Sequence, residues 1–195
     1  MSTLMNAKQY EDSLRKLNLK VYQFGRRVAN VVDDPIIRPS MNAVAATYEF
    51  AHKPEYEDIL TTTSHITGRK INRFTHIHQS TDDLVKKSKM GRLMGSLTAC
   101  CFQRCVGMDA MNALSITTYA IDEKHGTEYY KRFLKYLEFV QDNDLVCDGA
   151  MTDPKGDRGL GPKKQFDPDL FMHIVEERPG GIVVSGAKAH QTGAV

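Results

Sequence analysis

The sequence lacks the features that mark membrane, secreted and nucleic-acid-binding proteins. No apolar run approaches the roughly 20 residues that span a bilayer. The first residues, Met-Ser-Thr-Leu-Met-Asn-Ala-Lys, do not form the charged head and apolar core of a secretory signal. The 26 basic and 24 acidic residues are interspersed and leave a formal charge of only +2. We therefore expect a cytoplasmic protein that binds neither membranes nor nucleic acid.

Cysteine is scarce, with four residues in a chain of 195. Cys100, Cys101 and Cys105 lie too close together to join distant segments, which leaves Cys147. A disulfide scaffold is not expected, and metal binding or simple burial remains. Repeats and low-complexity tracts are absent as well, and 41% hydrophobic with 26% charged residues is typical of a globular protein.

Apolar residues recur every three or four positions through most of the chain, a spacing that predicts buried helical faces. Gly126 is placed to end one helix and Thr127 to cap the next. The expected helices are Tyr10 to Val32, Ser40 to about Pro54, Tyr56 to Thr63, Ser80 to about His125 with a possible break near Gly107, and Thr127 to about Asn143.

The pattern changes after Leu145. Leu145 to Cys147 is a short apolar run that predicts a strand, and a stretch rich in glycine and proline follows. Two more strands are expected, Leu170 to Glu177 and Ile182 to Lys188, joined by a turn at Arg-Pro-Gly-Gly. The predicted fold is mainly α with a partial β domain: residues 1–144 form a helical domain, and residues 145–195 begin a β domain.

The segment from Gly68 to Gln79 is predicted to be a loop with five basic or imidazole side chains. It is either a solvated basic loop or a contact for an anion such as phosphate. The side chains are those of Arg69, Lys70, Arg73, His76 and His78.

Cys101 and Cys105 stand four residues apart in a predicted helix, so both sulfurs should project from one helical face. A tetrahedral or cluster site usually takes four protein ligands, so the pair would supply half of one. The alternative is burial, since cysteine is among the most buried residue types. Cys147 is expected in the core.

Two further segments have the composition of a ligand site. In Asp148 to Gly159, glycines and a proline make a tight turn with exposed amides, and Lys155 and Arg158 add positive charge, as a phosphate or a flavin pyrophosphate requires. In Gly186 to Ala194, small residues leave room for a flat ligand beside the donors of Lys188, His190, Gln191 and Thr192. The alternatives are a solvated surface turn for the first segment and a polar strand end for the second, because both have similar compositions without binding a ligand.

Four motifs together resemble the 4-hydroxyphenylacetate 3-hydroxylase flavoprotein family, and within it the members that dehydrate an acyl-CoA. The motifs are Arg-Phe-Thr-His-Ile-His-Gln-Ser, Cys-Phe-Gln-Arg-Cys, Asp-Gly-Ala-Met-Thr-Asp-Pro-Lys-Gly-Asp-Arg-Gly and Gly-Ala-Lys-Ala-His-Gln-Thr-Gly-Ala. The resemblance extends over essentially the whole chain. It implies an acyl-CoA dehydrogenase-like fold, of which this chain would hold the N-terminal helical domain and the opening of the middle β domain.

The resemblance also implies two cofactors, FAD and a 4Fe-4S cluster. Cys101 and Cys105 would bind the cluster, and the other two ligands would come from a C-terminal portion or a partner subunit. Gln103 resembles an active-site glutamine, and Thr192 resembles a catalytic threonine that lies against the flavin ring. The residues expected to bind FAD are Met151, Thr152, Asp153, Pro154, Lys155, Gly156, Asp157, Arg158, Lys188, Gln191 and Thr192.

The implied reaction is the reversible dehydration of 4-hydroxybutyryl-CoA to crotonyl-CoA, in an anaerobic cytoplasm and by a homotetramer. This chain alone is expected to be inactive, because the remaining cluster ligands and the base are not in it. One alternative is a flavin-dependent aromatic hydroxylase of the same family, which has no cluster. The other is a non-catalytic helical module that pairs with another subunit.

Overall fold

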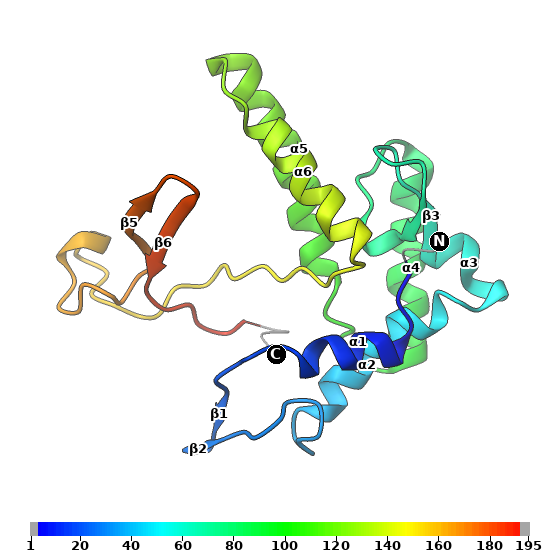
Figure 1. The fold of residues 1–195 in the computed structure, drawn as a ribbon, viewed down its shortest axis with the longest axis horizontal. Helices are drawn as coiled ribbons and strands as arrows, with labels where there is room; N and C mark the ends of the chain where they lie inside the picture. The colour runs from blue at the N-terminus through cyan, green and yellow to red at the C-terminus, as the bar shows by residue number, and fades with distance from the viewer. Residues whose placement is uncertain (1–3, 192–195) are drawn as a thin grey trace. The chain divides into compact units, whose positions relative to one another are not determined.

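The chain divides into two compact units, Met1–Cys147 and Asp148–Ala194 (Figure 1). The structure is a computed structural model that describes residues 4–191. The first unit holds the six α-helices of the described residues, and the second holds a β-hairpin. The predicted fold class, mainly α with a partial β domain, is confirmed.

The first unit is built from helices linked by short hairpins and turns. Its α-helices are α1 Ala7–Arg15, α2 Arg38–Phe50, α3 Glu57–Leu60, α4 Thr81–Thr98, α5 Cys105–His125 and α6 Tyr129–Asp142. Two small antiparallel hairpins pair β1 Tyr22–Gln23 with β2 Arg26–Arg27, and β3 Thr61–Thr63 with β4 Lys70–Asn72. The 3-10 turns are η1 Pro54–Tyr56 and η2 Arg73–Thr75.

The second unit contains one antiparallel hairpin, β5 His173–Arg178 with β6 Gly181–Ser185, and the 3-10 turn η3 Pro162–Lys164. The register pairs His173 with Ser185 and Arg178 with Gly181. Both predicted strands and the turn between them are confirmed. The predicted strand Leu145 to Cys147 is wrong, because that segment is extended chain with no strand partner.

The core of the first unit forms where amphipathic helices face one another. In Figure 1, α5 and α6 lie side by side, and Met111 of α5 packs with Phe133, Leu137 and Val140 of α6. The periodicity of this segment therefore produces a buried face in α6, with Phe133, Leu137 and Val140 buried and Tyr130 and Leu134 partly buried. Each such side chain contributes roughly 1.5–3 kcal/mol relative to its exposed state.

Several helix boundaries differ from the prediction. The expected helix Tyr10 to Val32 ends at Arg15, and further along the chain Phe24 and Gly25 form a turn with φ angles of 50° and 77° between β1 and β2. Val28 and Val31 of the periodic apolar set are buried, but from a loop, and Leu17 and Phe24 of the same set are exposed. In the predicted helix Tyr56 to Thr63, only Glu57–Leu60 is α-helical.

The ends of the later helices were predicted in part. Ser80 caps α4 by accepting the Asp83 N–H at 3.2 Å, and Gly126 ends α5 with φ 63°, both as expected. Thr127 does not cap α6. Asp122 takes that place, since its carboxylate accepts the N–H groups of Tyr129 and Tyr130, both at 2.8 Å.

Within the segment Gly68 to Gln79, residues 71–77 are buried and Arg69 and Lys70 are exposed, so the solvated-loop interpretation is wrong for Arg73 and His76. Arg73 is 3% exposed and donates to the carbonyl oxygens of Asp58, Ile59 and Thr61. Its guanidinium also contacts the Asp83 carboxylate at 3.1 Å. The positive charge of Arg73 is therefore paired inside the fold, and its contact with Asp83 links η2 to the first turn of α4.

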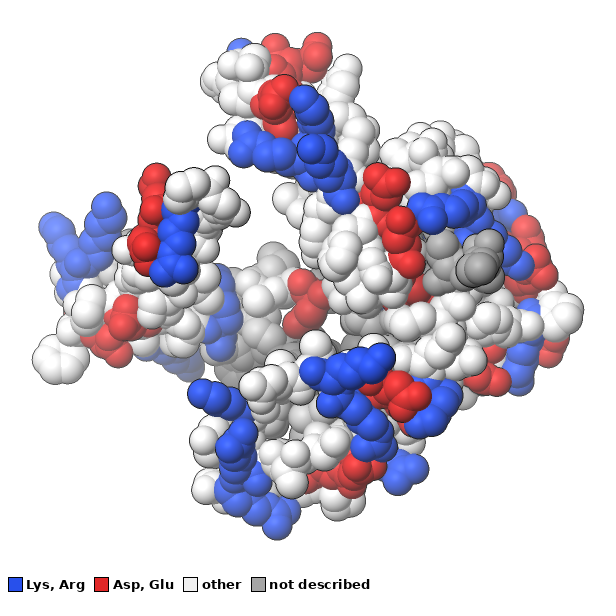
Figure 2. Space-filling model, viewed as in Figure 1, with Lys and Arg blue, Asp and Glu red and all other residues white. Residues whose placement is uncertain are grey.

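The surface carries both signs of charge, as the interspersed basic and acidic residues of the sequence predict. Figure 2 shows basic and acidic side chains close together over the helical unit. Within residues 4–191, none of the helices has the length and apolar character needed to cross a bilayer.

Gly107 permits a close crossing of two backbones. A Cβ at this position of α5 would overlap the carbonyl oxygen of Cys147 and lie 2.6 Å from its carbonyl carbon. Backbone cannot move aside as a side-chain tip can. We predict that Gly107→Ala lowers the free energy of unfolding by roughly 3 kcal/mol, measured by urea denaturation.

Gly91→Ala is the matched control for that substitution. Gly91 lies inside α4, and a Cβ there would meet nothing within 4 Å. The control should be stabilised by about 0.5–1 kcal/mol, because alanine favours the helix. Equal free energies of unfolding for Gly107→Ala and Gly91→Ala would contradict the close crossing of the two backbones at Gly107.

The half-buried carboxylate of Asp83 predicts a loss of stability in acid. Burial alone would raise its pKa, but the Gln79 N–H, His76 and Ser80 together lower the pKa to about 2. The resulting stabilisation, about 2 kcal/mol, is complete above the ordinary carboxyl pKa and disappears as the pH falls from 4 towards 2. Asp83→Asn should therefore have a lower Tm than wild type at pH 7. The difference in Tm between the two proteins should be smaller at pH 2.5.

The control for this prediction is Asp12→Asn, which removes an exposed ion pair with Lys8. Its Tm should change little at either pH. A constant difference between Asp83→Asn and wild type across the pH range would show that the Asp83 charge is not what stabilises the fold.

Candidate functional site

The two candidate metal-binding cysteines do not share a helical face. Helix α4 ends at Thr98, Cys101 lies exposed in the connection 99–104, and Cys105 is the first residue of α5. The prediction of one continuous helix through both residues is therefore wrong. The break lies at residues 99–104 and not at Gly107, although the connection contains neither glycine nor proline.

The sulfurs nevertheless lie within electrostatic reach of each other. Burial raises the pKa of Cys105, and the neighbouring Cys101 raises it further, while the N–H groups of Val106 and Cys105 itself favour the thiolate. These N–H groups belong to the start of a 21-residue helix, where the helix dipole also favours a negative charge. Two soft donors at this position suit a thiophilic metal centre.

The described residues do not complete a metal site by themselves. Within residues 4–191, no group of three or more histidine, cysteine, aspartate or glutamate side chains is arranged to hold a metal ion. The donor chemistry of Cys101 and Cys105 fits half of a four-ligand iron–sulfur set. A complete set needs two further ligands from outside these residues.

Gln103 lies between the two cysteines in an unusual backbone conformation. Its φ is 61°, in the left-handed region, and its side chain is half-buried. A residue with a Cβ costs roughly 1–2 kcal/mol in this conformation, so the surroundings must hold it there. Ala99, at the end of α4, has φ 52° as well.

Arg104 anchors this connection in the core. The side chain is 2% exposed, and it donates to Thr47 Oγ1 at 3.1 Å and to Asp144 Oδ1 at 3.3 Å. Its guanidinium also lies over the rings of Tyr48 and Phe74, at 4.3 Å and 5.0 Å from their centroids. The connection 99–104 is therefore tied to α2, η2 and the end of α6.

Asp144 completes this buried cluster. Its carboxylate accepts the N–H of Met5 at 3.0 Å, and its backbone carbonyl accepts the hydroxyl of Tyr48 at 2.7 Å. Burial raises the pKa of Asp144, against the opposing effect of Arg104. Sequence reasoning missed both partners, because no local pattern marks an arginine or an aspartate as buried.

In the second unit, two segments predicted to bind FAD come together. Ala189 N–H donates to Thr152 O at 2.9 Å, and Met151 N–H donates to Gln191 Oε1 at 3.2 Å. Lys188 Nζ contacts Asp153 Oδ1 at 2.6 Å, which neutralises one of the expected cations. Thr192 lies outside the described residues.

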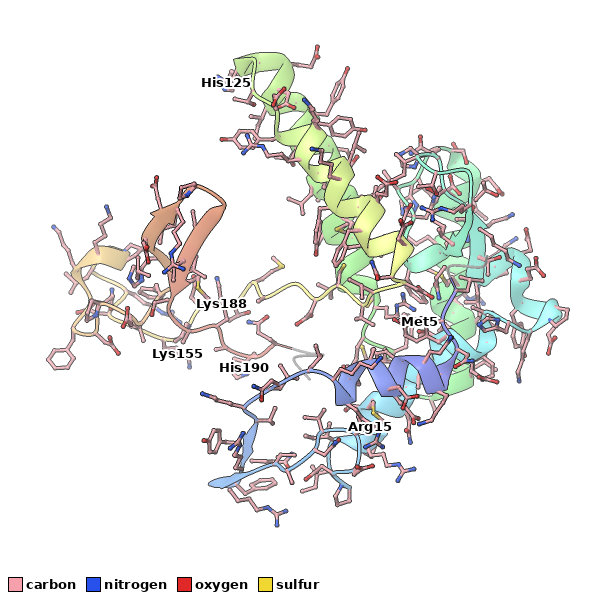
Figure 3. The ribbon with its side chains drawn as sticks, in the orientation of Figure 1. Met5, Arg15, His125, Lys155, Lys188 and His190 are labelled. Carbon is pink, nitrogen blue, oxygen red and sulfur yellow. The ribbon has the colours of Figure 1, made fainter. Side chains whose placement is uncertain are left out.

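A groove of about 480 Å³ runs beside these segments. Its apolar lining includes Phe171 and Met172, Lys155 and Arg158 supply positive charge, and the paired Lys188 and Asp153 also line it. Figure 3 shows Lys155 and Lys188 in the non-hairpin part of the second unit. The remaining predicted residues Pro154, Gly156 and Asp157 line the same groove.

Gln165 organises the loop at one side of this groove, and sequence reasoning missed it. Its amide nitrogen donates to the carbonyls of Asp157 at 2.9 Å and Leu160 at 3.2 Å, and its Oε1 accepts the Asp157 N–H at 2.8 Å. The Gly159 N–H donates to the Asp157 side chain. The expectation of a loop with exposed amides is therefore wrong at Asp157 and Gly159.

The helical unit and the β-hairpin that follows it match the N-terminal part of an acyl-CoA dehydrogenase-like flavoprotein fold. The chain belongs to the family described as 4-hydroxyphenylacetate 3-hydroxylase N terminal, which it matches over residues 6–195.

Relatives within this family include dehydratases. The chain is 64% identical over 98% of its length to the 4-hydroxybutyryl-CoA dehydratase/vinylacetyl-CoA Δ-isomerase of Clostridium aminobutyricum. It matches the structure of an oxygen-tolerant archaeal 4-hydroxybutyryl-CoA dehydratase from N. maritimus with a TM-score of 0.90 and 56% identity over 96% of the chain. It spans 39% of the length of the first and 37% of the second.

An oxygenase shares the fold at lower identity. The oxygenase component of 4-hydroxyphenylacetate 3-monooxygenase, solved with FAD and 4-hydroxyphenylacetate, matches with a TM-score of 0.73 and 23% identity, over 94% of this chain and 38% of that chain. The chain is thus far more similar to the dehydratases than to this oxygenase.

The contact between Gly156 and Gln165 predicts how the groove loop responds to substitution. A Cβ at Gly156 would collide with the Gln165 amide oxygen and lie 2.8 Å from Leu170 Cδ2. Gly156→Ala should displace the amide and weaken its hydrogen bonds to the loop. We expect trypsin to cleave after Arg158 about fivefold faster, which corresponds to the loss of about one hydrogen bond.

Gly161→Ala is the matched control in the same loop. Its φ is −69°, and a Cβ there would meet nothing within 4 Å. Cleavage after Arg158 should stay at the wild-type rate in this variant. If both alanine variants are cleaved equally fast, Gln165 does not hold the loop.

Proposed function

We propose that this chain forms the N-terminal part of an enzyme that reversibly dehydrates 4-hydroxybutyryl-CoA to crotonyl-CoA and isomerises vinylacetyl-CoA. The observation that carries this proposal is the 64% identity over 98% of the chain to an enzyme named for these two activities. The substrate is then an acyl-CoA. The rest of the enzyme would come from a C-terminal portion or a partner subunit, in a cytoplasmic homo-oligomer.

Cys101 and Cys105 are the residues of this chain that would bind a 4Fe-4S cluster. Cys105 is the first residue of α5, where the N–H groups of Val106 and of Cys105 itself and the helix dipole favour a thiolate against the opposing effect of burial, and Cys101 lies four residues earlier in the connection 99–104. When bound, the cluster would supply a Lewis-acidic iron for the departing hydroxyl, and FAD a one-electron acceptor.

Gln103 would act on the substrate from between these cysteines. Its amide is uncharged at every relevant pH and offers both a donor and an acceptor. It can therefore orient a hydroxyl or a thioester carbonyl without exchanging a proton. The strained backbone at φ 61° supports this role, since such conformations are concentrated at active sites.

The groove of the second unit would bind FAD. Lys155 and Arg158 can face the pyrophosphate, and the apolar lining from Phe171 and Met172 suits a flat ring. Gln191 and Lys188 would fix the backbone at Met151 and Thr152, which they already contact. Thr192 would lie against the flavin.

A flavin-dependent aromatic hydroxylase is the second candidate, supported by the fold that the chain shares with the oxygenase component. This function uses no iron–sulfur cluster, so iron and sulfide content separate the two. A non-catalytic helical module would bind neither iron nor flavin.

The test is anaerobic production of the chain together with the region of the Clostridium aminobutyricum enzyme that follows its match to this chain. We expect a complex with about four iron and four sulfide per chain, as a 4Fe-4S cluster requires, together with bound FAD and crotonyl-CoA formation. Flavin without iron would favour the hydroxylase, and a complex without either cofactor would favour the non-catalytic module.

Cysteine variants test the ligand assignment in this complex. Cys101→Ser and Cys105→Ser should each lower the iron and sulfide content at least about fivefold, because serine is a poor ligand for iron. Cys100→Ser, the matched control one residue away, should keep both. Equal iron content in all three variants would contradict the assignment.

A further inference from the structure

We infer that Arg104 is a positioning residue: its buried contacts with Asp144, Thr47 and two aromatic rings fix the connection 99–104 and so place Gln103 and Cys105. The inference rests on the proposed function for the roles of Gln103 and Cys105. Arg104 itself is buried in the core and would touch neither substrate nor cofactor.

The Arg104 guanidinium is held from several directions. Thr47 and Tyr48 belong to α2, Phe74 to η2, and Asp144 follows α6. These elements are far apart in sequence and meet only in the folded unit. A side chain fixed in this way leaves its own backbone, and the residues on either side of it, little freedom.

Two strained backbone positions lie at the ion pair. Gln103 precedes Arg104 with φ 61°, and Asp144 has φ 45°. Neither residue is glycine, and a glutamine rarely adopts this region because its Cβ lies too close to the following carbonyl oxygen. Such conformations persist only where several contacts with the surrounding structure hold the residue in place. The Arg104–Asp144 pair is the interaction that joins the two strained positions.

A buried ion pair is not by itself a source of net stability. Well-packed apolar side chains often stabilise a core as well as a buried ion pair or better, because the charges must be removed from water. Stability alone therefore does not explain Arg104 at 2% exposure. Placement of the flanking residues Gln103 and Cys105 does.

The reactivity of Cys105 towards iodoacetamide reports this placement and requires neither iron nor flavin. Cys105 is half-buried, whereas Cys100 and Cys101 are exposed, so peptide mass mapping should find Cys105 modified more slowly. The rate for Cys105 is taken relative to that of Cys101 in the same molecule. A failure of this test is therefore distinct from a failure of the proposed function.

The decisive variant is Arg104→Met with Asp144→Asn, which removes both charges and keeps side chains of similar size. The methionine can still pack on the rings of Tyr48 and Phe74, and the asparagine can still accept the N–H of Met5. We expect a folded protein in which the relative rate of Cys105 rises about tenfold, equivalent to ~1.4 kcal/mol of lost protection. A folded double variant with the wild-type rate would overturn the inference.

Arg104→Lys provides a second measurement that keeps the charge. A lysine lacks the planar fork that reaches Thr47 and Asp144 together, so we expect an intermediate Cys105 rate. Because the charge is unchanged, this increase would report position and not a shifted thiol pKa. A folded Arg104→Lys protein with the wild-type rate would overturn the inference even if the double variant does not fold.

Arg69→Met with Asp142→Asn is the matched control. It removes an arginine–aspartate pair of the same unit whose side chains are 43% and 36% exposed. The relative rate of Cys105 should stay at the wild-type value. An increase equal to that of the Arg104 variants would show that the loss of any ion pair loosens Cys105, and would overturn the specific role of Arg104.

Discussion

The buried pair of Arg104 and Asp144 is the interaction on which the arrangement of the helical unit depends. Each side chain is 2% exposed, and removal of either partner would leave a charge in the core, which typically costs 3–5 kcal/mol. Through this pair, the connection 99–104 is joined to the end of α6. Asp144 in turn binds the backbone of Met5, so the N-terminal segment is joined to the same point.

This constraint explains why the helical region is interrupted where it is. Residues 81–125 contain no proline, and the connection 99–104 contains no glycine, so local propensity favours one long helix. The break occurs because Arg104 is drawn into the core between Tyr48 and Phe74. The candidate iron ligands then lie in the connection and at the first residue of α5, where N–H groups without helical partners are available.

The sequence predicts the parts of the fold that local chemistry determines. Periodicity predicts α6, Ser80 and Gly126 predict two helix ends, and Pro179-Gly180 predicts the turn between β5 and β6. It does not predict the break at residues 99–104 or the burial of Arg73, because both depend on partners distant in the chain. For the candidate site, composition indicates which segments to consider, whereas the roles of Arg104 and Gln165 appear only when carbonyls and rings from other elements are in place.

Different interactions hold each of the two candidate sites in its conformation. The segment around Gln103 is fixed by burial, so a change there is coupled to the stability of the whole helical unit. The groove loop in the second unit is fixed by exposed hydrogen bonds from Gln165, while Ile174, Val175, Ile182 and Val184 of its hairpin remain 48–58% exposed. A two-stranded hairpin of this kind is marginal without further cover. Ligand binding in the groove should therefore depend on local order, and thiol placement near α5 on the global fold.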